Sequence, residues 1–323
     1  MDVCFILLFL RKGSSAWPRN SLLAESFGAM FTIDYFLKRT ASKFSPREAL
    51  VCAGRRISYA DFDQGVTRLA NTLISLGVKK GDPVALLAYN GPEFAYAVFG
   101  VQRAGAVCLP LNYRLKTQEL TYILEDSESK VILYGTQFSE TVNSLRGKTR
   151  LDRYICLSEE EAADKSLPAG SPPRYPQVEI EEEGPATLLY TSGTTGHPKG
   201  AVLTHKNLIW TCVSQAVEYG VSGADKVLIT SPMFHTGAFF RFLTAVYLGN
   251  TICLMEQFDP VKFLEIIQEE EITFTSLVPT MFIMVDQLPE NVKNSFRTTS
   301  LRKYITSGSI LPVDLVRLSL IHI

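Results

Sequence analysis

Residues 186–200 read ATLLYTSGTTGHPKG and join a short apolar run to a loop of glycines and hydroxyl side chains. The apolar run, residues 186–190, has the length and composition of a strand. A helix is predicted to begin near Thr204, so the polar loop lies between a strand and a helix. The composition of this loop points to anion binding.

The residue types in the loop are those that hold phosphate. Glycines let the backbone turn its N–H groups toward one concave spot, hydroxyl groups donate further hydrogen bonds, and a lysine adds a mobile positive charge. The residues concerned are Thr191, Ser192, Gly193, Thr194, Thr195, Gly196 and Lys199. Lys199 stands between Pro198 and Gly200, which excludes a Walker A loop, and the glycine spacing excludes a G-x-G-x-x-G motif. A polar surface turn is the alternative interpretation, but the preceding strand and the Pro-Lys-Gly ending favour phosphate binding.

The chain before this loop alternates strand and helix patterns. Residues 49–59 predict two short strands with a turn at Gly54, and Ser58 with Asp61 forms a capping signature for a helix that ends near Gly77. Further strands are predicted at residues 84–88, 106–109 and 131–134, and further helices at residues 92–105 and 117–124. This repetition predicts an α/β fold with parallel sheets flanked by helices.

Residues 158–184 interrupt the alternation with an acidic, proline-rich stretch. We interpret this stretch as an exposed connector, although its acidity would also suit a segment that binds a partner. The sequence therefore predicts a first α/β subdomain at residues 30–157 and a second one, which contains the phosphate loop, at residues 185–318.

Composition and charge exclude several classes of protein. The 323 residues are 46% hydrophobic and 20% charged, as in ordinary globular proteins. The formal net charge of -1 provides no overall field that would attract nucleic acid or anionic lipid. The six cysteines occur singly, without a C-x-x-C pair, so neither a zinc site nor a redox motif is predicted. We expect buried, reduced thiols and a cytoplasmic location.

Both ends of the chain depart from globular patterning. Residues 4–10, CFILLFL, are too few to cross a bilayer, and they lack the preceding positive charge of a secretory signal. We expect Met30 to be the natural start and residues 1–29 to be a non-native or disordered extension. Residues 319–323 crowd apolar side chains together with Leu318 and form an anomalous tail, so the second subdomain is expected to be incomplete.

Residues 188–199, LLYTSGTTGHPK, resemble the AMP-binding signature of the adenylate-forming superfamily, which includes acyl-CoA synthetases, firefly luciferases and nonribosomal peptide adenylation domains. Residues 57–94 and 100–126 resemble adjoining blocks of that family, and the likeness extends over residues 31–318. The resemblance implies the N-terminal large domain of the adenylate-forming fold without its C-terminal small domain.

The resemblance also implies roles for particular residues. Thr191 to Gly196 and Lys199 would contact the β- and γ-phosphates of ATP, and His235 in the motif SPMFHTG would line the site of the carboxylate and the α-phosphate. Gly308 and Ser309, in ITSGSIL, would lie beside adenine. Residues 278–282, VPTMF, resemble the border of the acyl pocket, although they would also fit a plain core.

The implied reaction has two steps. A carboxylate, expected to be that of a fatty acid, attacks the α-phosphate of ATP with Mg²⁺ to give an acyl-adenylate, and coenzyme A then takes the acyl group. Because the family's remaining motifs would lie beyond Leu318, we expect the chain as written to lack full activity. A non-catalytic nucleotide-binding fragment and an adenylation module that loads a carrier protein are the alternatives. No oligomeric state is predicted.

Overall fold

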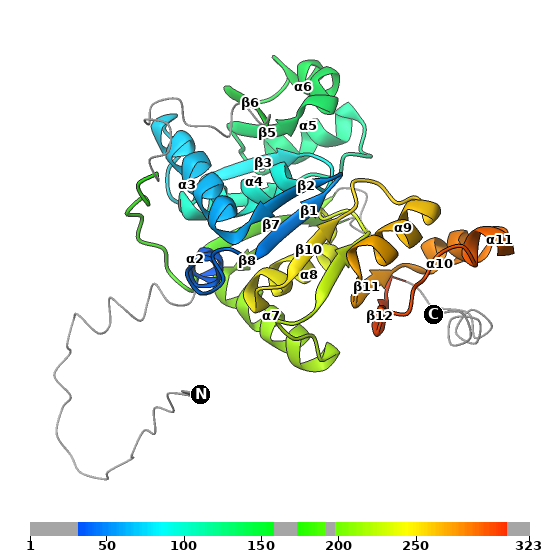
Figure 1. The fold of residues 1–323 in the computed structure, drawn as a ribbon. Helices are drawn as coiled ribbons and strands as arrows, with labels where there is room; N and C mark the ends of the chain where they lie inside the picture. Colours follow the sequence, from blue (N-terminus) through cyan, green and yellow to red (C-terminus); the bar gives the residue numbers. More distant parts are fainter. Residues whose placement is uncertain (1–31, 158–172, 192–197, 309–323) are drawn as a thin grey trace, which may run out of the picture.

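The computed structural model describes residues 32–157, 173–191 and 198–308 (Figure 1). The expectations for residues 1–29 and 319–323, and for residues 158–172 of the connector, lie outside these residues. Within them the chain forms two six-stranded sheets with helices packed on their faces. The predicted α/β fold with parallel sheets flanked by helices is confirmed.

The first sheet, sheet A, combines strands from two distant parts of the sequence. In spatial order its strands are β12 (Lys303–Thr306), β11 (Phe274–Leu277), β9 (Lys226–Ile229), β10 (Thr251–Leu254), β1 (Glu48–Cys52) and β2 (Arg55–Ser58). All neighbours are parallel except β1 and β2, which form a hairpin. Gly54 supports the turn of that hairpin with a φ of 81°, a conformation that glycine adopts without a steric penalty.

The second sheet, sheet B, is likewise parallel except at one edge. Its strands in spatial order are β6 (Arg153–Leu157), β5 (Val131–Gly135), β3 (Pro83–Leu87), β4 (Val107–Pro110), β7 (Pro185–Thr191) and β8 (Lys199–Thr204). The antiparallel pair is β7 and β8. Strand β8 was not predicted, because its residues are mostly exposed and therefore lack the apolar run that marked the buried strands.

Helices fill the space between the sheets and cover both outer faces. The main helices are α2 (Ile33–Lys43), α3 (Tyr59–Ser75), α4 (Pro92–Arg103), α5 (Thr117–Asp126), α6 (Ser139–Leu145), α7 (His205–Tyr219), α8 (Thr236–Leu248), α9 (Pro260–Glu270), α10 (Pro279–Asp286) and α11 (Glu290–Lys293). The predicted cap of α3 is confirmed, because the Ser58 side chain accepts a hydrogen bond from the Asp61 N–H.

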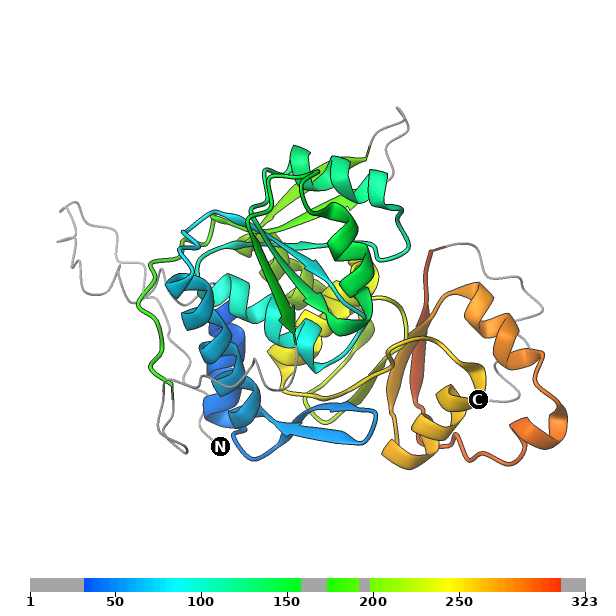
Figure 2. The same ribbon diagram turned by 90° about the horizontal axis from the view of Figure 1, so that it is seen from above.

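Alternate residues of the strands face different cores, which defines the layers. Val84 and Leu86 of β3 share a core with α2, α3, α4, α7 and α8, and with one face of sheet A. Ala85 and Leu87 face the opposite side, where α5 and α6 pack. The other face of sheet A is covered by α9 and α10. Figure 2 shows the orange helices α9 to α11 well separated from α5 and α6, with the central helices between them. Strands buried on both faces explain the continuous apolar runs in the sequence.

Each sheet contains strands from both sides of the predicted connector. In sheet A, Leu50 of β1 pairs with Ile252 of β10, and in sheet B, Cys108 of β4 pairs with Thr187 of β7. The predicted division of the chain into residues 30–157 and 185–318 is therefore not a division between the two sheets. Local patterns could not reveal this exchange, because parallel pairing joins strands that are distant in the sequence.

The described part of the connector, residues 173–184, contains no helix or strand, but it is not simply a solvated loop. The Tyr175 hydroxyl donates a hydrogen bond to Asp34, and the Arg103 guanidinium lies 4.8 Å from the centre of the Tyr175 ring. Arg103 is fully buried and also pairs with Asp34 and Asp63. All described residues of the connector are exposed or half-buried, as expected of a surface segment, and Tyr175 packs this segment against α2 and α4.

Candidate active site

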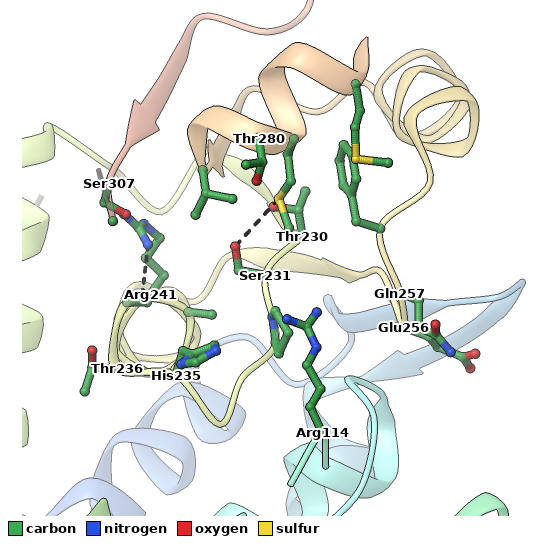
Figure 3. Close-up of a pocket in the computed structure, with 18 of the residues that line it drawn as sticks. Arg114, Thr230, Ser231, His235, Thr236, Arg241, Glu256, Gln257, Thr280 and Ser307 are labelled. Carbon is green, nitrogen blue, oxygen red and sulfur yellow. Dashed lines mark hydrogen bonds between the residues drawn. The ribbon is translucent and has the colours of Figure 1, made fainter. Parts of the chain in front are cut away.

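A cavity of about 710 Å³ opens at the carboxyl ends of the parallel strands of sheet A (Figure 3). Its lining includes Thr230 and Ser231 after β9, Glu256 after β10, Val278 after β11, and Gly308 after β12. Loops that leave the carboxyl ends of parallel strands form the usual ligand sites of open α/β sheets.

The cavity also lies where the order of the strands reverses. The chain leaves β9 through α8 and returns in β10 on one side, whereas it leaves β11 through α10 and returns in β12 on the other side. Because β9 and β11 are neighbours, their loops diverge and leave a crevice between them. Ligands bind at such topological switch points in doubly wound folds.

His235 is at the edge of this crevice, immediately before the first residue of α8. Its side chain is open to the cavity, yet partial desolvation by the surrounding protein and the nearby Arg114 both lower its pKa. The imidazole is therefore neutral at pH 7. The N-terminal end of α8 faces the same space, and a helix N-terminus favours negative charge.

Asn90 holds the loop that carries His235. Its side-chain nitrogen donates to the carbonyl oxygens of Ser231 at 2.9 Å and Met255 at 3.0 Å, and its side-chain oxygen accepts from the Met233 N–H at 2.8 Å. Asn90 is 3% exposed. It therefore ties the loop after β3 to the loops after β9 and β10 and fixes the position of the histidine.

Sheet B contributes to the cavity through the loop after β4. Tyr113 packs edge-on against Phe234, with ring centres 4.9 Å apart, and both Tyr113 and Arg114 line the cavity. Figure 3 shows the Arg114 side chain extending toward Ser231. The guanidinium of Arg114 adds positive charge beside His235, so the cavity suits an anionic group of a ligand.

Thr191 and Lys199 belong to the predicted phosphate loop and carry side-chain donors, and both lie at the base of a hairpin. Thr191 ends β7, Lys199 begins β8, and the two residues are paired across the sheet. Both side chains are exposed, and neither lines the cavity. Residues 192–197, which include Ser192, Gly193, Thr194, Thr195 and Gly196, lie outside the described residues.

Of the two residues predicted to lie beside adenine, the structure describes Gly308. Gly308 follows β12, has a φ of 94°, and lines the cavity together with His235. Ser309 lies outside the described residues. In the segment 278–282, Val278, Thr280 and Met281 line the cavity, whereas Phe282 belongs to the core.

The sequence model of one protein family, described as AMP-binding enzyme, matches residues 37–320. The chain belongs to the AMP-binding enzyme family. Within curated proteins of this family, the chain is 36% identical over 276 residues to a feruloyl-CoA synthase from an Amycolatopsis species, covering 85% of this chain and 54% of the relative. It is 33% identical over 265 residues to the long-chain-fatty-acid–CoA ligase FadD13 of Mycobacterium tuberculosis, covering 81% of this chain and 52% of the relative.

Solved structures agree with this assignment. The N-terminal domain of FACL13 from Mycobacterium tuberculosis superposes with a TM-score of 0.83 at 31% identity, over 90% of this chain and 73% of that chain. The chain spans about half the length of the curated relatives it matches. The predicted resemblance to the adenylate-forming superfamily and its acyl-CoA synthetases is therefore confirmed, as is the fold of an N-terminal large domain.

Three side chains at or near this site of the AMP-binding enzyme were not predicted from the sequence. Asn90 and Arg114 follow the predicted strands of sheet B, and Arg241 lies on α8 beyond His235. The rule that ligands bind at the carboxyl ends of parallel strands would have pointed to Asn90 and Arg114. Arg241 carried no signal, because an arginine inside a helical pattern is ordinarily read as part of an exposed face.

The family implies Mg²⁺ together with ATP. Among the described residues no group of three or more histidine, cysteine, aspartate or glutamate side chains could hold a metal ion. Mg²⁺ commonly binds through substrate phosphates with only one or two protein carboxylates. No described helix is long and apolar enough to cross a membrane.

Proposed function

We propose that this chain forms part of an AMP-forming acid–thiol ligase, which joins a carboxylic acid to AMP and then transfers the acyl group to coenzyme A. The observation that carries the proposal is the meeting of His235, Arg114 and Gly308 around one cavity at the switch point of sheet A. The family relatives that are CoA ligases support the reaction class.

The residues suit a reaction that joins two anions. The carboxylate must approach the α-phosphate, so the main requirement is to neutralise charge and align the reactants. Arg114 and the N-terminus of α8 supply positive potential at the cavity, and the neutral imidazole of His235 can exchange hydrogen bonds with the carboxylate. Bound Mg²⁺ would neutralise phosphate charge.

We assign the β- and γ-phosphates to the hairpin that begins with Thr191 and ends with Lys199. Lys199 is exposed at the end of this hairpin, where its ammonium can reach a leaving pyrophosphate. The six residues between Pro198 and Thr191 supply the glycines and hydroxyls of the proposed phosphate loop. Ser309 is assigned, with Gly308, to the adenine.

The acid is proposed to have an apolar body. Val278, Met281 and Met284 form an apolar part of the cavity wall, with Phe258 nearby. Methionine side chains adapt to ligands of different shape, which fits relatives that act on either aromatic or fatty acids. A role in fatty-acid metabolism and a cytoplasmic location belong to this proposal.

The test is a pyrophosphate-release assay on the full-length protein that contains this chain, with ATP, magnesium, coenzyme A and a panel of fatty, aromatic and dicarboxylic acids. Lys199→Ala should lower the rate roughly 10- to 150-fold, since one charge-assisted contact contributes about 1.5 to 3 kcal/mol. Lys206→Ala is the matched control, because Lys206 is an exposed lysine paired with Glu183.

Two outcomes would contradict the proposal. Equal rates for Lys199→Ala and Lys206→Ala would show that Lys199 does not bind the phosphates. An absence of acid-dependent pyrophosphate release from the full-length protein across the panel would remove the ligase assignment. Release of pyrophosphate without formation of acyl-CoA would instead show that the acid is adenylated but not transferred to coenzyme A.

A further inference from the structure

Arg241 is a buried arginine in the wall of the cavity, and no described residue neutralises it. It is 7% exposed, and its Nη1 donates to the Gly237 carbonyl oxygen at 3.0 Å. Its Nε is buried without a hydrogen-bond partner among the described residues. No described carboxylate forms an ion pair with it, and burial lowers its pKa. A buried charge without a partner is strongly unfavourable for folding.

A second arginine that is buried among the described residues, Arg103, shows how a guanidinium with a structural role is paired in this fold. Arg103 is fully buried, and it pairs with the carboxylates of Asp34 and Asp63 and donates to the Thr67 hydroxyl. Arg241 has none of these partners. The difference indicates that the counter-charge of Arg241 comes from a ligand in the cavity.

Arg241 is distinct from Arg114, the arginine beside His235, where the reacting carboxylate is proposed to bind. Arg114 is the arginine whose charge lowers the pKa of His235, and Arg241 does not contribute to that shift. Figure 3 draws Arg241 and Ser307 on one side of the cavity and Arg114 with Glu256 on the other. The cavity therefore presents two points of positive charge to one ligand.

The surroundings of Arg241 strengthen its interaction with an anion. Arg241 is 7% exposed, so solvent screens its guanidinium little, and Val278, Met281 and Met284 line the same cavity. An acid with a purely hydrocarbon body would leave the guanidinium unpaired. A carboxylate in the cavity would supply the missing counter-charge and accept a charge-assisted hydrogen bond from the guanidinium.

We infer that Arg241 binds a second carboxylate at the distal end of the acid substrate, and that the preferred substrates are dicarboxylic acids. This inference rests on the proposed ligase function, which places the first carboxylate beside His235. Arg241 is then a specificity-determining residue. It selects acids by the charge at their far end, and the apolar wall contacts the chain between the two carboxylates.

The test compares matched pairs of acids on the full-length protein: adipate with hexanoate, and suberate with octanoate. The wild-type protein should prefer the diacid of each pair in kcat/KM. Arg241→Leu should lower the ratio of diacid to monoacid kcat/KM by about 10- to 150-fold, the loss expected when a charged hydrogen-bonding partner is removed. Arg241→Lys should retain part of the preference, and Arg153→Leu, at an exposed arginine of β6, is the matched control.

A structural role for Arg241 would give different results. Arg241→Leu should unfold at the same temperature as the wild type or at a higher one, because it removes an unpaired buried charge. A lower unfolding temperature, together with equal losses for both acids of a pair, would overturn the inference. A wild-type preference for the monoacids, or an unchanged ratio in Arg241→Leu, would also overturn it.

Measuring the binding of the acids directly distinguishes a failure of the second carboxylate site from a failure of the ligase proposal. Calorimetric titration of adipate and hexanoate needs no turnover. Tighter binding of adipate that is lost in Arg241→Leu would support the second carboxylate site even if no acyl-CoA is formed. Equal affinity for the two acids would overturn the site even if the protein proves to be a ligase.

Discussion

Replacing Asn90 with alanine should both destabilise the fold and displace His235. Asn90 is 3% exposed, and its side chain makes three hydrogen bonds, with the carbonyl oxygens of Ser231 and Met255 and with the Met233 N–H. The substitution leaves these three backbone groups without their partner. A buried polar group left unpaired costs about 1 to 3 kcal/mol, and water can satisfy part of a carbonyl, so we expect a loss of about 2 to 4 kcal/mol.

A second substitution separates hydrogen bonding from side-chain volume. Asn90→Asp keeps the size of the side chain and an oxygen that can accept from the Met233 N–H. It replaces the donor to Ser231 and Met255 with a carboxylate oxygen, which faces two carbonyl oxygens. We therefore expect Asn90→Asp to be at least as destabilising as Asn90→Ala, although it removes no volume.

The measurement is urea-induced unfolding of the variants, together with pyrophosphate release from the full-length protein. Asn71→Ala is the control, because the Asn71 side chain makes an exposed hydrogen bond to the Arg174 carbonyl oxygen and should change stability by less than about 0.5 kcal/mol. A displacement of His235 by about 1 Å should lower the rate about 100-fold in Asn90→Ala.

This prediction fails if Asn90→Ala matches Asn71→Ala in unfolding free energy, because the three hydrogen bonds would then not hold the loop. It fails also if Asn90→Asp is clearly more stable than Asn90→Ala, since side-chain volume would then outweigh donor geometry. A destabilised Asn90→Ala that turns over at the wild-type rate would show that His235 is positioned by other contacts.

Three further substitutions test the buried polar groups by urea unfolding. Arg103→Met should lower the unfolding free energy by about 3 to 5 kcal/mol, because it leaves buried Asp34 without its arginine; an unchanged value would contradict this. Tyr175→Phe should cost about 1 to 2 kcal/mol, and no loss would show that the connector is not held by its hydrogen bond to Asp34. Burial lowers the pKa of His205 from 6.5 to about 4, so the neutral form is favoured in the folded state. The contribution of neutral His205 to the free energy of unfolding is present above pH 6.5 and is lost as the pH falls toward 4, by at most about 3 kcal/mol. His205→Gln should reduce the change in unfolding free energy between pH 6.5 and pH 4. An unchanged slope between these pH values would show that His205 is not the group responsible.

Local patterns in the sequence predicted most of the elements. The turn at Gly54, the cap at Ser58 and the helix that begins at Pro92 all appear where the sequence places them, because turns and caps depend on residues within a few positions of one another. Strand β8 was missed because an exposed edge strand carries little apolar signal, and its pairing with β7 becomes evident only in the folded sheet.

The sequence by itself determined the family, because a contiguous signature such as LLYTSGTTGHPK carries its residues in fixed order. It also singled out His235 and Gly308. Only the tertiary structure decided that both line one cavity with Arg114 and Arg241. Asn90 binds backbone groups 141 to 165 residues away, and Leu50 pairs with Ile252. Such contacts depend on which strands become neighbours in the sheets, and local periodicity fixes the kind of each element but not its neighbours.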